Sequence, residues 1–244
     1  MGKLIVISSG KGGVGKSTVA VGLATALNNG GKKVLLIDAD EGLRCLDLML
    51  SVTDKLVFDL SDILEDDSLI ESAIYPIKNM NGLFLLPAPA TEGTTNKEKM
   101  AAQIELFTDV YDYVIVDCSA GYNEELCSFF SNKATFILVS LTDAVSTRDV
   151  YFVGEMLRKY KLSNLYMIVN CFKKSEVKKF KINIDKMIDE TAVKLLGIVP
   201  FDNQVKVAAH RGKPIKLGRA AKALHRIAAR IDGADIPLPK VTDI

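Results

Sequence analysis

The chain has 244 residues, of which 48% are hydrophobic and 25% charged, and its formal net charge is +1. This balance is ordinary for a globular protein with a large core, and it excludes a basic field over the whole surface that would point to nucleic acid. No apolar run approaches the roughly 18–20 residues that a membrane span needs.

The first predicted strand, at residues 3–8, leads directly into a glycine-rich loop. Residues 10–18 read GKGGVGKST, which meets the phosphate-loop pattern G-x-x-x-x-G-K-[ST]. Its glycines let several backbone N–H groups point into one concavity, where Lys16 adds positive charge and the Ser17 hydroxyl can ligate Mg²⁺. A helix is predicted at residues 17–27. The expected nucleotide-binding residues of the loop are Gly10, Lys11, Gly12, Gly13, Val14, Gly15, Lys16, Ser17 and Thr18.

Strands and helices alternate along the rest of the chain, which predicts an α/β fold with a mostly parallel central sheet covered by helices on both faces. Ligands bind such sheets outside the carboxyl ends of the strands. The further strands are predicted at residues 33–40, 83–87, 113–117, 135–140, 165–170 and 195–200, and helices lie near 56–65, 95–110, 122–131, 147–160 and 181–191. We expect one domain over residues 1–232 and an irregular tail over 233–244.

Carboxylates follow two of these strands. Asp117 ends an apolar strand, and a carboxylate at a strand end beside a phosphate loop usually holds Mg²⁺, often through water. Asp38 and Asp40 lie two residues apart, so both point the same way in an extended chain. One of them can orient a water for attack on a phosphate, or instead cap the turn at residues 41–42.

Three segments together resemble the MinD/ParA family of P-loop ATPases, over roughly residues 1–232. Residues 10–18 are similar to the deviant Walker A motif of that family, which carries a second lysine. Residues 37–47, IDADEGLRCLD, resemble switch I on the MinD side of the family, and residues 117–121 resemble switch II. Cys45 replaces the usual asparagine of switch I, and Ser119 replaces the proline of switch II.

The resemblance implies catalytic roles for Lys11, Lys16 and Asp40. Lys11 is the signature lysine, which reaches across a homodimer to the partner's phosphates, as an arginine finger does. Lys16 binds phosphates within its own chain. Asp40 positions the attacking water.

The resemblance also implies ligands for the metal and the base. Ser17 ligates Mg²⁺, and Asp38 and Asp117 support the ion through waters. Without the family pattern, an asparagine at a strand end is more often a turn former. The residues expected at the adenine of ATP or ADP are Asn170, Pro200 and Asp202.

The expected function is a regulatory switch: ATP closes a homodimer, hydrolysis to ADP and phosphate releases it, and a protein activator or cargo reads the state in cell division or partitioning. One alternative is a metallocentre-maturation ATPase of the same superfamily, which needs bridging cysteines. Cys127 is a candidate, but no paired cysteine lies near residues 87–100. A small-molecule ligase on the same fold is another alternative.

The surface on which the switch acts is left open. MinD-type proteins end in a short basic amphipathic helix, whereas residues 233–244 contain two prolines and one lysine, a poor interfacial anchor. Residues 219–231 are amphipathic, which predicts either a helix packed on the sheet or a basic face that binds a membrane or nucleic acid. Non-specific DNA binding stays an alternative. We expect a cytoplasmic protein, with peripheral membrane contact unresolved. The basic surface that DNA binding would use, or that is otherwise a solvated helix, is the lysine cluster Lys173, Lys174, Lys178, Lys179 and Lys181.

Overall fold

The computed structural model describes residues 1–121, 128–130, 133–160, 164–180 and 183–240. Over these residues the strands form one eight-stranded sheet in the order β3-β4-β2-β5-β1-β6-β7-β8. Its pairings are parallel except for the short edge strand β3 against β4. The predicted α/β fold is therefore confirmed. The strands are β1 (Lys3–Ser8), β2 (Val34–Ala39), β3 (Tyr75–Pro76), β4 (Leu83–Leu86), β5 (Tyr113–Cys118), β6 (Ala134–Ser140), β7 (Leu165–Phe172) and β8 (Lys194–Pro200).

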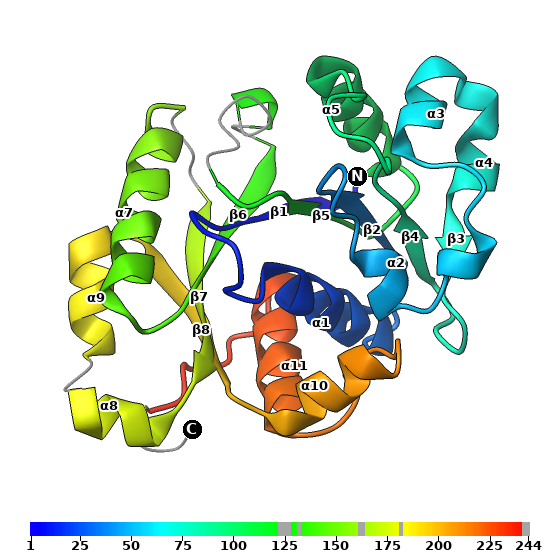
Figure 1. Ribbon diagram of the computed structural model, residues 1–244. Helices are drawn as coiled ribbons and strands as arrows, with labels where there is room; N and C mark the ends of the chain where they lie inside the picture. The colour runs from blue at the N-terminus through cyan, green and yellow to red at the C-terminus, as the bar shows by residue number, and fades with distance from the viewer. Residues whose placement is uncertain (122–127, 131–132, 161–163, 181–182, 241–244) are drawn as a thin grey trace.

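Helices cover both faces of the sheet (Figure 1). Along β1, Leu4 and Val6 face one core and Ile5 and Ile7 face the other, because successive side chains of a strand alternate. The face of Ile5 is covered by α1 (Lys16–Asn29), α2 (Leu46–Met49) and α11 (Arg219–Asp232). The face of Leu4 is covered by α3 (Leu60–Glu65), α4 (Ile70–Ala73), α5 (Lys97–Phe107), α7 (Ala144–Arg158) and α9 (Ile184–Thr191). The shorter elements are η1 (Thr53–Lys55), η2 (Asp67–Leu69), α8 (Lys174–Phe180) and α10 (Asn203–His210).

Helix α11 is part of the core, which confirms that residues 219–231 form a packed helix. Leu224 and Ile227 are each 1% exposed. A Cβ on Gly22 of α1 would lie 2.4 Å from Leu224 Cδ1, and a Cβ on Gly197 of β8 would lie 2.5 Å from Ile227 Cγ1. Glycines therefore allow the close approach of this helix to both neighbours.

Helix starts are set by capping side chains that periodicity does not reveal. The helix predicted at 95–110 begins after Asn96, whose side chain accepts a hydrogen bond from the Lys99 N–H. The helix predicted at 181–191 begins after Asn183, which caps α9 in the same way. Much of the helix predicted at 122–131 falls outside the described residues, as do Cys127 and Lys181 of the sequence-based hypotheses.

The segment after α11 forms neither helix nor strand over residues 234–240. The Arg230 guanidinium donates hydrogen bonds to the carbonyl oxygens of Ile236 and Pro237, at 2.7 and 2.6 Å, and so holds this segment against the end of α11. Among the helices that the structure describes, none is both long enough and apolar enough to cross a membrane.

Candidate functional site

The phosphate loop and the predicted carboxylates meet at the carboxyl ends of three adjacent strands. β1 leads into the loop, β2 carries Asp38 and leads to Asp40, and β5 carries Asp117; the three strands are neighbours in the sheet. Asp38 pairs with Asp117 in the β2–β5 register. The structure therefore brings together residues about 80 positions apart in sequence, as the strand order of a parallel sheet requires.

The loop has the backbone of a phosphate cradle. Gly13 and Gly15 have φ angles of 81° and 86°, in the left-handed region that favours glycine. Gly15 is the N-cap of α1 and has no side chain to occupy the first N–H groups of the helix, which leaves them for an anion. A Cβ on Gly15 would lie only 2.3 Å from Asn170 Nδ2, so the position is also closed to larger residues.

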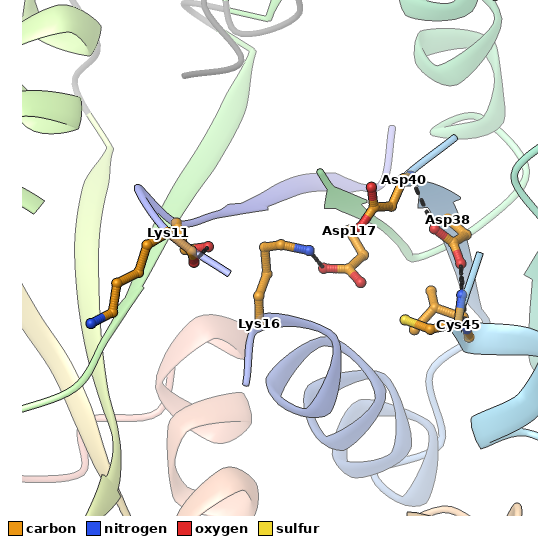
Figure 2. Close-up of polar contacts among 8 residues, drawn as sticks. Lys11, Lys16, Asp38, Asp40, Cys45 and Asp117 are labelled. Carbon is orange, nitrogen blue, oxygen red and sulfur yellow. Dashed lines mark hydrogen bonds and ion pairs between the residues drawn. The ribbon is translucent and has the colours of Figure 1, made fainter. Parts of the chain in front are cut away.

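Lys16 and Asp117 form a buried ion pair, with Nζ and Oδ1 2.9 Å apart. Their side chains are 7% and 0% exposed. Burial raises the pKa of Asp117, and Lys16 opposes this shift; the same carboxylate keeps the pKa of Lys16 above its ordinary value despite burial. The second carboxylate oxygen, Asp117 Oδ2, is buried without a hydrogen bond among the described residues. Figure 2 shows the ammonium group of Lys16 directed at Asp117.

Asp38 organises the chain that follows β2. Its Oδ1 accepts the N–H of Asp40 at 3.0 Å, and its Oδ2 accepts the N–H groups of Cys45 and Leu46 at 3.2 and 3.1 Å (Figure 2). Asp38 thus fixes the backbone on both sides of the turn at residues 41–42 without accepting from that turn itself. Asp40 is half-buried beyond it, and burial raises the pKa of Asp40 while Lys16 opposes the shift.

Asp38 makes the stability of the ligand-free protein depend on pH. Burial, together with the charge of Asp117, raises the pKa of Asp38 to about 7, despite three backbone N–H donors. The folded protein thus holds this proton more tightly than the unfolded chain, and stability present at low pH is lost as pH rises to the folded pKa. Each pKa unit corresponds to about 1.4 kcal/mol, so the loss approaches roughly 4 kcal/mol above pH 7.

Replacing Asp38 with asparagine is therefore expected to shift the Tm of the nucleotide-free protein upward by more at pH 8 than near pH 5, where only part of this stability has been lost. Asparagine carries no charge, but its single oxygen replaces only one of the two accepting oxygens of Asp38, so the variant loses backbone hydrogen bonds at every pH. Thermal unfolding of both proteins at the two pH values measures this difference. A difference in Tm between variant and parent that is the same at both pH values would contradict the proposed cause.

Lys11 lies apart from the other site residues of its own chain. Its Nζ is 3.6 Å from Asp143 Oδ1, and the two side chains are 37% and 45% exposed. Asp143 is the N-cap of α7 and accepts the N–H of Ser146 at 2.9 Å. Figure 2 shows Lys11 directed away from Lys16 and Asp117. The Lys11 ammonium is therefore held near Asp143 and away from the Lys16–Asp117 pair in this conformation.

The residues expected at the base line one pocket beside the loop. It has a volume of about 90 Å³, and Asn170, Pro200 and Asp202 line it together with Gly15 and Thr18 of the loop. Asn170 Nδ2 donates to the Val14 carbonyl at 2.9 Å. The Asp202 carboxylate accepts the N–H groups of Gln204 and Ala220, at 2.9 and 3.1 Å, and so joins the starts of α10 and α11.

Sequence reasoning missed two acidic neighbours of Asp40. Glu41 is tied to Lys97 and to the Gly93 N–H, and Glu92 adds to the rise in the pKa of Asp40. Neither lies at a fixed position of a motif, and their partners are distant in sequence, so no pattern could have found them.

A phosphate loop between the first strand and helix, facing carboxylates on the adjoining strands, defines a P-loop nucleotide-binding protein. The model of the ParA family, described as NUBPL iron-transfer P-loop NTPase, matches residues 1–232. The chain belongs to this family, on the side of the MinD septum site-determining proteins, and is a MinD/ParA-type ATPase of the class that regulates cell division.

Several proteins similar to this chain are MinD proteins. The chain is 35% identical to MinD of Synechocystis over 97% of this chain and 92% of that protein, and 33% identical to MinD of Bacillus subtilis over 98% and 92%. Among solved structures, MinD in a MinC:MinD complex of Aquifex aeolicus is 34% identical with a TM-score of 0.87, covering 98% of this chain and 99% of that one. MinD of Pyrococcus horikoshii, complexed with Mg-ADP, is 30% identical with a TM-score of 0.84, covering 97% and 100%.

Within the described part of the chain, no group of three or more His, Cys, Asp or Glu side chains is arranged to hold a metal ion. Cys45 is half-buried, and burial raises the pKa of its thiol to about 11. The thiol beside the loop is therefore protonated at neutral pH.

Proposed function

We propose that this chain is a Mg²⁺-dependent ATPase whose ATP-bound form closes a homodimer and whose hydrolysis of ATP to ADP and phosphate releases it. The observation that carries the proposal is that the two lysines of the loop have different positions and different ion-pair partners. Lys16 is buried beside the phosphate loop against Asp117, whereas Lys11 is partly exposed and directed away from both. A lysine in that position serves a second subunit better than its own site.

Within one subunit, the backbone of residues 10–18 binds the phosphates and Lys16 supplies positive charge. Among the described residues, Asp117 is the only ion-pair partner of Lys16. The Lys16 ammonium leaves this carboxylate for the phosphate oxygens when the nucleotide binds. Asp40, held by its N–H on Asp38, accepts a hydrogen bond from the attacking water and aligns it. The base lies at the pocket formed by Asn170, Pro200 and Asp202.

The donors beside the loop fit Mg²⁺, a hard cation that prefers oxygen ligands. Asp117 Oδ2 is a buried oxygen with no hydrogen bond from the part of the chain that the structure describes, and the Ser17 hydroxyl lies at the start of α1. Ser17 and Asp117 would hold the ion, and Asp38 would act through waters. When bound, the ion neutralises charge on the phosphates. The Mg-ADP complex of the Pyrococcus relative supports this assignment.

A closed dimer offers a surface to a protein partner, and the MinC:MinD complex of Aquifex supports a partner of that kind. We place the ATPase domain at residues 1–232 and the tail at 233–244, and we propose a cytoplasmic protein for which the membrane and DNA are the two candidate surfaces. Co-sedimentation with liposomes and with DNA, each with ATP at two salt concentrations, separates membrane binding from ParA-like DNA binding.

Light scattering of the protein without nucleotide, with ADP and with a non-hydrolysable ATP analogue tests the switch. We expect monomers in the first two conditions and dimers in the third, and EDTA should abolish the dimer. A protein that stays monomeric with the analogue and Mg²⁺ would refute the proposal.

A further inference from the structure

The residue after Asp40 is fixed by a contact that lies outside the family's motifs. Glu41 forms an ion pair with Lys97, and its Oε2 accepts the Gly93 N–H at 2.7 Å. The Glu41 side chain is 10% exposed and that of Lys97 is 32% exposed. A carboxylate so little exposed needs its cation and its N–H donor, because each unpaired buried charge is costly.

The same two segments meet again one residue further on. The Gly42 N–H donates to the Pro89 carbonyl at 3.0 Å. Gly42 has a φ of 80°, and a Cβ there would lie 2.7 Å from Glu92 Cγ. The segment at residues 89–97 therefore lies directly against the chain that carries Asp40.

Asp40 is thus held from two sides. On the side of the sheet, its N–H donates to Asp38 Oδ1. On the other side, the next residue is tied to the start of α5, since Lys97 is the first residue of that helix. The charges of Lys16 and Glu92 act on the Asp40 carboxylate, and its position depends on where the backbone between the Asp38 and Glu41 contacts runs.

The charges around Glu41 strengthen its contact with Lys97. Burial alone would raise the pKa of Glu41, but the Lys97 ammonium and the Gly93 N–H hold it below its ordinary value, so Glu41 is ionised at neutral pH. Glu92 contributes negative charge on the same side of Asp40. Lys97 is the ion-pair partner of Glu41 that the structure describes. Without Lys97, the Glu41 carboxylate would lie close to other carboxylates with no described cation beside it.

We propose that Glu41 is a positioning residue for ATP hydrolysis, with Lys97 as its charged partner: together they fix the backbone that directs Asp40 at the attacking water. The inference rests on the proposed ATPase function. It also makes the start of α5 a point from which a contact on the surface changes the hydrolysis rate without touching the nucleotide.

The test compares kcat with ATP affinity in Glu41→Ala, Glu41→Gln, Lys97→Met and Lys97→Arg. Losing the anchor is expected to lower kcat about tenfold while the Kd for a fluorescent ATP analogue stays within about twofold, because a misplaced catalytic group slows the reaction and not binding. Lys97→Arg should restore most of kcat. Lys99→Met on the same helix is the matched control, because its side chain has no described ion pair.

The outcomes separate this inference from the proposed function. Full turnover in Glu41→Ala and Lys97→Met, beside an active parent protein, would overturn the positioning role alone. A loss of kcat accompanied by an equal loss of ATP affinity and of Tm would show that the contact only stabilises the fold, and would overturn the positioning role. A parent protein that does not hydrolyse ATP would overturn both.

Discussion

Replacing Asp40 with alanine is expected to slow ATP turnover by roughly 100-fold or more, since a positioned base contributes about 10²–10⁴-fold. ATP binding should be unaffected. Asp40 lies at the mouth of the site beside Lys16, but the cradle that holds the phosphates is built from the backbone of the loop and from Lys16 itself. Removing the carboxylate leaves that cradle complete.

The variant should therefore accumulate as an ATP-bound dimer. Single-turnover hydrolysis measures the chemical step, a fluorescent nucleotide gives the Kd, and light scattering gives the oligomeric state. Asp54→Ala is the matched control, because Asp54 is an exposed acid in η1, away from the strand ends. Turnover within threefold of the parent protein would remove Asp40 from the mechanism.

The parts of the site that the sequence predicts are those carried by short, contiguous segments. The phosphate loop occupies nine consecutive residues, and Asp38 and Asp117 each close an apolar strand. Strand identity and the parallel order then suffice to bring them together. The same reasoning gives the fold, since long apolar strands alternating with helices have one stable arrangement, with helices on both faces.

The parts that it does not predict depend on partners far apart in the chain. Glu41 meets Lys97 across 56 residues, and no local pattern links them. The hydrogen bonds from backbone N–H groups of residues 40–46 to Asp38 depend on the local turn, and the role of Asp38 toward Mg²⁺ through waters stays a prediction. Short elements such as β3, α8 and α10 were missed because two to eight residues give too little periodicity.

Replacing Lys11 with alanine is expected to abolish ATP-driven dimerisation and to lower turnover by roughly 100-fold or more, because a cation supplied from a partner can be worth 10³-fold or above in phosphoryl transfer. ATP binding to the monomer should change little, since Lys16 supplies the charge within the chain. The ion pair of Lys11 with Asp143 is partly exposed and contributes about 1 kcal/mol at most, so it does not prevent Lys11 from reaching a partner subunit. Asp143→Asn is accordingly the control that should still dimerise.

Mixing two inactive variants decides whether Lys11 acts on its own site or on that of a partner. In a dimer of Lys11→Ala with Asp40→Ala, the first chain keeps Asp40 and Lys16 and receives Lys11 from the second. Action across the interface therefore predicts that turnover reappears on mixing, in proportion to the mixed dimer, and that neither variant alone shows it. If Lys11 instead served its own chain, every site in the mixture would lack either Lys11 or Asp40, and mixing would restore nothing. The Lys11 side chain is partly exposed and directed away from Lys16 and Asp117 in the single chain, which favours the first result.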